Sequence, residues 1–280
     1  MKTYQFTSNA WGYVHADRPG TTVGIMNRLR QLGFDGFDLL LGTDAFPKMT
    51  IAEAELEQNR LRSSLLPLAS LVLVSFDLSD IEKCIADLIR TTQLATEWRV
   101  GHVHLLPRKV GITHQSGMEN MREVWSQVGD IVVASGIPIS AENHATSRDP
   151  DEDTFLIRNE KDFWKFLETS DGGIRVKFDP AWLLWAGDNP VSALNRLLPH
   201  TEILDVKDSR DRQFVRPGTG DVDFKALEGI VRDSERINFI SVEVESQHFA
   251  KPEIIDTDQI DLIHKSDLEF YRTLFRRHDE

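Results

Sequence analysis

Four acidic residues stand at comparable places in four successive strand-like segments of the second half of the chain. They are Glu142 in ISAENHA, Asp179 in RVKFDPA, Asp205 in EILDVKD and Glu243 in ISVEVES. Carboxylates that point into a folded core lose hydration and repel one another unless a cation neutralises them. Four oxygen donors without a cysteine favour a hard divalent ion, so we expect a metal site, with Mn2+ first and Mg2+ or Co2+ as alternatives.

A single acid at a strand end is more often the partner of a nearby lysine or arginine than a metal ligand. The metal interpretation therefore depends on the repetition of one residue class at one level of neighbouring strands.

A cation bridging a carbonyl and a neighbouring hydroxyl oxygen would acidify the C–H between them and stabilise an enediolate. Glutamates can then transfer the proton, and we expect Glu142 and Glu243 to act as general base and acid. Lys207, two residues beyond Asp205, could hold or polarise a substrate oxygen. If a leaving hydroxyl lies β to the carbonyl, the same chemistry gives dehydration.

Further residues are candidates for substrate binding, each with a structural alternative. His104 and His144 could bind hydroxyl groups or serve as core histidines, and His102 lies deeper on the strand of His104. Glu245 shares the inward face of its strand with Glu243 by the period-two rule and could contact substrate or Lys207 instead of metal.

Aromatic and basic residues near the expected strand ends form a second group of candidates. Trp182 is favoured over Trp11 and Trp185 as an apolar wall for a sugar ring. Arginines on the loops could bind an anionic group, although exposed loop arginines are common. They are Arg148, Arg212 and Arg216.

Eight β-branched or apolar segments, separated by helical patterns, are predicted to be the strands that position these side chains. They start near Tyr4, Gly36, Leu68, Gly101, Ile137, Ile174, Glu202 and Asn238. Strands that alternate with helices indicate parallel pairing, and eight of them predict a closed (β/α)8 barrel. We expect residues 1–280 to form one such domain, closed by a helix over Asp258 to Arg277.

Helix ends carry local signals of the same architecture. Gly33 and Gly136 follow helical patterns and predict their C-terminal ends, while Asn189 and Pro190 predict the start of another helix. The longest loops are expected after the fourth, fifth, seventh and eighth strands, at the carboxyl ends, where the mouth of a barrel carries its site.

The composition argues against several classes of function. A net charge of −13 would repel a phosphate backbone, and no basic patch opposes it, so we expect no nucleic-acid partner. No apolar stretch is long enough to span a membrane. The single cysteine, Cys84, lies in a helical pattern and reads as a buried apolar residue. We expect a cytoplasmic protein with a small sugar-like substrate and the capacity to form a homo-oligomer.

Several motifs in order resemble the xylose isomerase-like superfamily of sugar isomerases and epimerases, which includes inosose dehydratases and an apurinic endonuclease branch. The resemblance rests on GFDGFDLLL, AENHA, KFDPAWLLWAGDNP, DVKD, RPGTGDVDF and SVEVES. It implies a metal held by Glu142, Asp179, the residue at 205 and Glu243. Two positions depart from the family pattern, because relatives usually have histidine in place of Asp205 and many have a substrate-binding histidine in place of Trp182.

These observations favour a metal-dependent isomerase or epimerase of a keto-sugar or related polyol. The alternative is a dehydratase or lyase acting on a keto-inositol, 3-keto-glycoside or dehydroshikimate-like substrate. A third alternative is a binding subunit that kept the barrel and lost activity through the changes at Asp205 and Trp182. The endonuclease branch is disfavoured because the chain has neither a histidine-rich ligand set nor a basic surface.

Overall fold

Parallel strands in a closed ring form the centre of the molecule. The computed structural model describes residues 4–14, 16–18, 20–42, 47–147, 149, 152–245 and 255–276. In spatial order the ring is β1-β10-β7-β6-β5-β4-β3-β2, and every neighbouring pair is parallel. The strands are β1 (Gln5–Ser8), β2 (Gly36–Leu41), β3 (Leu68–Asp77), β4 (His102–Arg108), β5 (Ile139–Glu142), β6 (Ile174–Phe178), β7 (Thr201–Val206) and β10 (Phe239–Val242). The predicted (β/α)8 barrel is confirmed, and each strand begins within two residues of its expected start.

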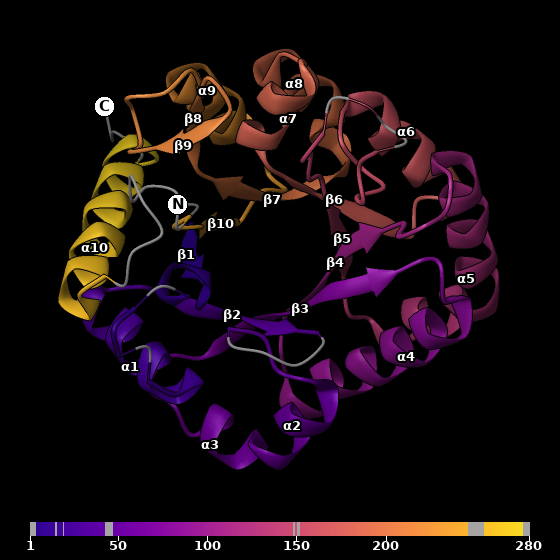
Figure 1. Cartoon of the computed structure of the whole chain (residues 1–280), viewed down its shortest axis with the longest axis horizontal. Coiled ribbons are helices and arrows are strands. Elements are labelled where there is room, and N and C mark those ends of the chain that lie inside the picture. Colours follow the sequence, from indigo (N-terminus) through magenta and orange to yellow (C-terminus); the bar gives the residue numbers. More distant parts are fainter. Residues whose placement is uncertain are drawn as a thin grey trace.

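Helices surround the ring on its outer side (Figure 1). Their inward faces cover the strands, which explains why segments such as Leu68–Asp77 are apolar on both faces. The α-helices are α1 (Thr22–Leu32), α2 (Ile51–Leu56), α3 (Gln58–Arg62), α4 (Ile81–Trp98), α5 (His114–Ser135), α6 (Glu160–Thr169), α7 (Pro180–Ala186), α8 (Pro190–Leu197), α9 (Phe224–Asp233) and α10 (Thr257–Leu274), with 3-10 turns at η1 (Trp11–Tyr13) and η2 (Leu198–His200). None of these described helices combines the length and apolar character that crossing a membrane requires.

The helix ends follow the local signals of the sequence. Gly33 ends α1 with a φ of 105° and Gly136 ends α5 with a φ of 70°, a left-handed conformation that glycine adopts without strain. The side chain of Asn189 caps α8, and Pro190 occupies its first turn. These signals are short-range, which is why the sequence alone could place them.

The C-terminal helix closes the ring against the first helix of the chain. In Figure 1, α10 (yellow) lies beside α1 (indigo), as expected for a closing helix. Arg28 on α1 pairs with Asp261 on α10 at 2.6 Å, and the hydroxyl of Tyr13 donates to the same carboxylate at 2.6 Å. Arg272 donates to the carbonyl oxygen of Gly33 at 2.6 Å. These contacts join the two ends of the barrel.

A short hairpin stands on the loop after β7 and was not expected from the sequence. Its strands are β8 (Asp208–Arg210) and β9 (Gln213–Val215), paired antiparallel. The two connecting residues, Asp211 and Arg212, both have positive φ, 52° and 59°. That geometry matches the twist of a two-residue hairpin turn. The hairpin brings Phe214 against Trp182 and Trp185 of α7.

Candidate metal centre

The four acidic residues converge inside the barrel. Ligand atoms of Glu142, Asp179, Asp205 and Glu243 all lie within 4.8 Å of one another. They come from the ends of β5, β6, β7 and β10, which are consecutive neighbours in the ring. Tertiary structure thus places together carboxylates that are far apart in the chain.

Asp179 has two separate structural roles. Its Oδ1 accepts from the backbone N–H groups of Ala181 and Trp182, at 2.8 and 3.1 Å, and so caps the first turn of α7. Asn143 fixes the backbone of Asp179 through two hydrogen bonds of 2.9 Å. Oδ2 is left to face the cluster, where it lies 3.0 Å from Nζ of Lys207. Burial raises the pKa of Asp179 to about 7 despite the opposing effect of Lys207.

Lys207 contacts three carboxylates at once. Its Nζ binds Asp179, Oε1 of Glu245 at 2.9 Å, and Oε2 of Glu243. The rings of Trp182 and Phe214 face the same ammonium, with centroids 5.2 and 5.4 Å away. Burial opposes the charge, but these carboxylates raise the pKa of Lys207 well above its ordinary value. Glu245 therefore binds Lys207, one of the two roles considered for it.

Glu243 is fixed at both carboxylate oxygens. Asn9 donates to Oε1 at 3.1 Å, and Lys207 contacts Oε2. Burial would raise the pKa of Glu243, yet the two buried lysines outweigh it and the pKa is lowered. Glu243 is consequently held in its ionised form, as a proton acceptor requires.

A second buried lysine, Lys177, binds the other two carboxylates of the cluster. Its Nζ is 2.6 Å from Oε2 of Glu142 and 2.5 Å from Oδ2 of Asp205. Burial would lower the pKa of Lys177, but Asp205 and Glu142 raise it well above its ordinary value. Lys177 was not recognised from the sequence, although its position two residues before Asp179 predicts the same inward face.

The residues present fit a divalent cation. Glu142, Asp179, Asp205, Glu243 and Glu245 are five buried or nearly buried carboxylates, while only Lys177 and Lys207 contact them as cations among the described residues. If all are ionised, three negative charges remain uncompensated, a costly state in a low-dielectric interior. Asp205 is fully buried and its Oδ1 accepts no hydrogen bond from the described residues, while its Oδ2 and that of Asp179 are paired with the ammonium groups of Lys177 and Lys207. A divalent cation would compensate this charge and bind these carboxylate oxygens.

An aromatic cluster borders the four carboxylates. The His144 ring lies between Phe155 and Trp182, with centroids 3.9 and 3.7 Å away, and Trp182 also packs on Trp185 and Phe214. Nδ1 of His144 and Nε1 of Trp182 are buried without a hydrogen-bond partner. These two predicted substrate contacts thus lie side by side with unused polar atoms close to Lys207. Burial lowers the pKa of His144 well below its ordinary value, which keeps the ring neutral.

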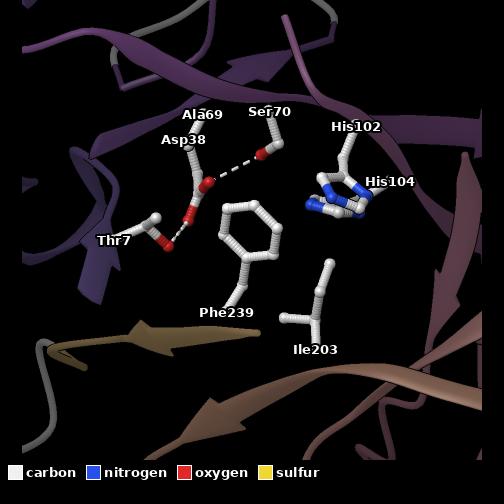
Figure 2. Close-up of a pocket in the computed structure, with 8 residues that line it drawn as sticks. All are labelled: Thr7, Asp38, Ala69, Ser70, His102, His104, Ile203 and Phe239. Atoms are coloured by element: carbon white, nitrogen blue, oxygen red, sulfur yellow. Dashed lines mark hydrogen bonds between the residues drawn. The ribbon is translucent and has the colours of Figure 1, made fainter. Parts of the chain in front are cut away.

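His104 lies below the carboxylates. It pairs in register with Ser140, two residues before Glu142, and its Nδ1 is 2.6 Å from the Ser140 hydroxyl. Figure 2 shows His104 beside His102 on the wall of a cavity of about 10 Å3, about the room of one water molecule. Burial lowers the pKa of both histidines. A substrate on the mouth side would meet Glu142 before it reached His104.

The same small cavity contains another buried acid, Asp38. Figure 2 shows its carboxylate accepting hydrogen bonds from Thr7 at 2.7 Å and Ser70 at 2.6 Å. Ser241 donates a third bond at 3.0 Å. Because three hydroxyl groups satisfy it, Asp38 has a structural role that its position in the GFDGFDLLL motif does not reveal.

The candidate arginines on the loops lie in different parts of the structure. Arg212 donates to the carbonyl oxygen of Thr146 at 3.0 Å and stands over Trp185, whereas the exposed Arg216 acts electrostatically on Asp267 of α10. Arg148 lies outside the described residues. Trp11 belongs to η1 and donates its backbone N–H to Asn9, the residue that binds Glu243.

The chain belongs to the family described as xylose isomerase-like TIM barrel, whose sequence profile matches residues 26–274. No sequence among curated proteins matches the chain significantly. Solved structures with the same fold span almost its whole length.

Three of these structures illustrate the range of the fold. D-psicose 3-epimerase from Clostridium cellulolyticum H10, with D-tagatose, is 14% identical with a TM-score of 0.72, covering 99% of this chain and 100% of its own. The probable 3-DHS dehydratase AsbF from Bacillus anthracis is 16% identical with a TM-score of 0.70, covering 95% and 98%. The IOLI protein with a bound zinc atom is 13% identical with a TM-score of 0.70, covering 98% of both chains. At these identities the likeness establishes the fold.

Proposed function

We propose that this protein is a divalent-metal-dependent isomerase or epimerase of a keto-sugar or related polyol, with Mn2+ as the preferred ion. The observation that carries the proposal is the convergence of Glu142, Asp179, Asp205 and Glu243 within 4.8 Å in a buried cluster that, among the described residues, only two lysines contact as cations. Family membership and the epimerases among proteins of the same fold support the reaction class.

A divalent ion bound here would polarise the carbonyl and hydroxyl oxygens of a keto-sugar and so acidify the C–H between them. Glu243 is a candidate for the base that accepts this proton, because Asn9 and Lys207 hold its carboxylate in place and the buried lysines keep it ionised. Glu142 approaches from β5, separated from β10 by β6 and β7, and would return a proton from another side. Lys207 would orient a substrate oxygen, and the rings of Trp182 and His144 would exclude water from the reacting carbon.

Dehydration is the second candidate function, because the fold is shared with a probable 3-DHS dehydratase. The same removal of a proton leads to loss of a hydroxyl group when the substrate carries one at the β position. Product analysis separates the two outcomes, since epimerisation conserves mass and dehydration lowers it by one water.

The first experiment measures metal in the purified, undialysed protein by elemental mass spectrometry. We expect about one Mn, Mg or Co per chain in the wild type and a loss of metal in Glu142→Gln/Glu243→Gln, because two anionic ligands become neutral amides. The exposed Glu235→Gln is the matched control and should keep its metal.

Metal-loaded protein would then be incubated in D2O with ketohexoses, 3-keto-glycosides and dehydroshikimate. Deuterium incorporation that the double variant lowers by about 10²-fold or more would support acid–base catalysis by the glutamates. A wild type that contains no metal and binds no added Mn2+ would refute the proposal and leave a barrel that acts as a binding protein.

A further inference from the structure

Lys177 contacts two carboxylates of the cluster from the strand between them. On β6 it pairs in register with Glu142, and its side chain is almost completely buried. Its ammonium lies between Oε2 of Glu142 and Oδ2 of Asp205, at 2.6 and 2.5 Å. A flexible lysine side chain is held in this position because two carboxylates contact it from neighbouring strands.

Within the described part of the chain, Asp205 and Glu142 contact Lys177 and no other cation within 4 Å, and Asp205 is the more deeply buried of the two. Asp179 caps α7 and contacts Lys207, and Glu243 binds both Asn9 and Lys207. Asp205 is fully buried, and within the described part of the chain Lys177 is the only cation within 4 Å of it. Without Lys177, Asp205 would be a buried carboxylate with no cation beside it, a strongly unfavourable state.

When both residues are ionised, their charges cancel. Position 205 is also where the chain departs from the histidine that the family resemblance led us to expect, so Asp205 adds a negative charge to the centre that a neutral imidazole would not. Lys177 supplies one positive charge at hydrogen-bond distance from that addition.

On the basis of the proposed function, we infer that Lys177 and Asp205 form one electrically neutral unit of the metal centre. Lys177 is a positioning residue: it compensates the charge of Asp205 and orients its carboxylate. The metal affinity therefore depends on the pair, and altering either residue alone leaves an unbalanced charge in the carboxylate cluster.

If Lys177 and Asp205 act as a pair, the effects of substituting them on Mn2+ affinity should not be additive. In Asp205→His, the ammonium of Lys177 faces a neutral ligand and repels the cation, so Mn2+ affinity falls by about tenfold or more. Adding Lys177→Met to Asp205→His removes that repulsion and recovers most of the loss. Substitutions at independent, distant sites would add without interaction.

Mn2+ affinity would be measured by isothermal titration calorimetry for the wild type, Asp205→His, Lys177→Met and the Lys177→Met/Asp205→His double variant. Lys225→Met in the Asp205→His background is the matched control, because it removes a positive charge from an exposed position on α9. It should change the affinity by less than about twofold to threefold, as expected for a distant surface charge in salt.

Thermal unfolding in EDTA provides a readout that needs no metal. Lys177→Met should lower the melting temperature of the wild type, and it should lower that of the Asp205→His variant clearly less. Interaction between the two substitutions in both measurements supports the inference. If the wild type binds Mn2+ and the effects of the two substitutions are additive, the inference is wrong and the proposed function is unaffected. If the wild type takes up no Mn2+, the proposed function is contradicted as well.

Discussion

At the scale of single residues, two buried lysines supply the positive charge that offsets five carboxylates clustered inside the barrel. Lys207 contacts three of them, and Lys177 contacts the other two. Breaking a buried ion pair by removing one partner is strongly destabilising, because it leaves an uncompensated buried charge. The lysines are therefore part of the fold as well as of the site.

We predict that Lys207→Met lowers the free energy of unfolding of the metal-free protein by about 3–5 kcal/mol, since three carboxylates lose their cation. Urea denaturation followed by circular dichroism would measure it. Lys225→Met, at an exposed position on α9, should stay within about 0.5 kcal/mol of wild type. Equal stability of Lys207→Met and wild type would mean that the carboxylates are protonated in the native protein.

At the scale of elements, the helix that closes the barrel carries a buried acid of its own. Asp267 on α10 is buried, and burial raises its pKa to about 7, with Arg216 opposing the shift. The native state then holds a proton on Asp267 that the unfolded chain, with a pKa near 3.9, has already released. The contribution of Asp267 to stability should therefore fall as the pH rises from about 4 to 7.

Asp267→Asn removes this dependence, and we predict that it stabilises the protein at pH 8 by about 1–3 kcal/mol relative to wild type, with little difference at pH 4. Chemical denaturation across this pH range would test it. The exposed Asp130→Asn on α5 serves as control and should leave the pH profile of stability unchanged. A variant that is less stable at pH 8 would show that the carboxylate is needed in its ionised form.

At the scale of the whole molecule, the carboxylate cluster proposed as the metal site draws on β5, β6, β7 and β10, which are also connected through backbone pairing and the outer helices. A ligand that binds only the native state stabilises it in proportion to the logarithm of its concentration. The metal is thus expected to stabilise the barrel as a unit.

We predict that Mn2+ at about 100 times its dissociation constant adds about 2.7 kcal/mol and raises the melting temperature by about 5 °C. Differential scanning fluorimetry with increasing Mn2+, and then with EDTA, would measure this shift. Glu142→Gln/Glu243→Gln should show no shift. A similar shift in that variant would place the bound ion elsewhere on the protein.

The sequence by itself determined the architecture and the acidic members of the site. Strand and helix periodicity, glycine at the ends of α1 and α5 and the cap before α8 are short-range signals, so the strands of the barrel were placed within two residues. An acidic residue at the ends of four successive predicted strands singled out the four carboxylates that the barrel brings together, because parallel strands present the same edge to the mouth.

Which charged side chains contact one another could be determined only from the tertiary structure. Lys177 looked like any strand residue until β6 was placed beside β5 and β7, where it pairs with Glu142 and Asp205. The hairpin that brings Phe214 to Lys207, and the position of His104 below the carboxylates, depend in the same way on pairing between distant strands and loops. Electrostatic pairing acts through space and at short distance, so the order of residues along the chain cannot specify it until the barrel closes.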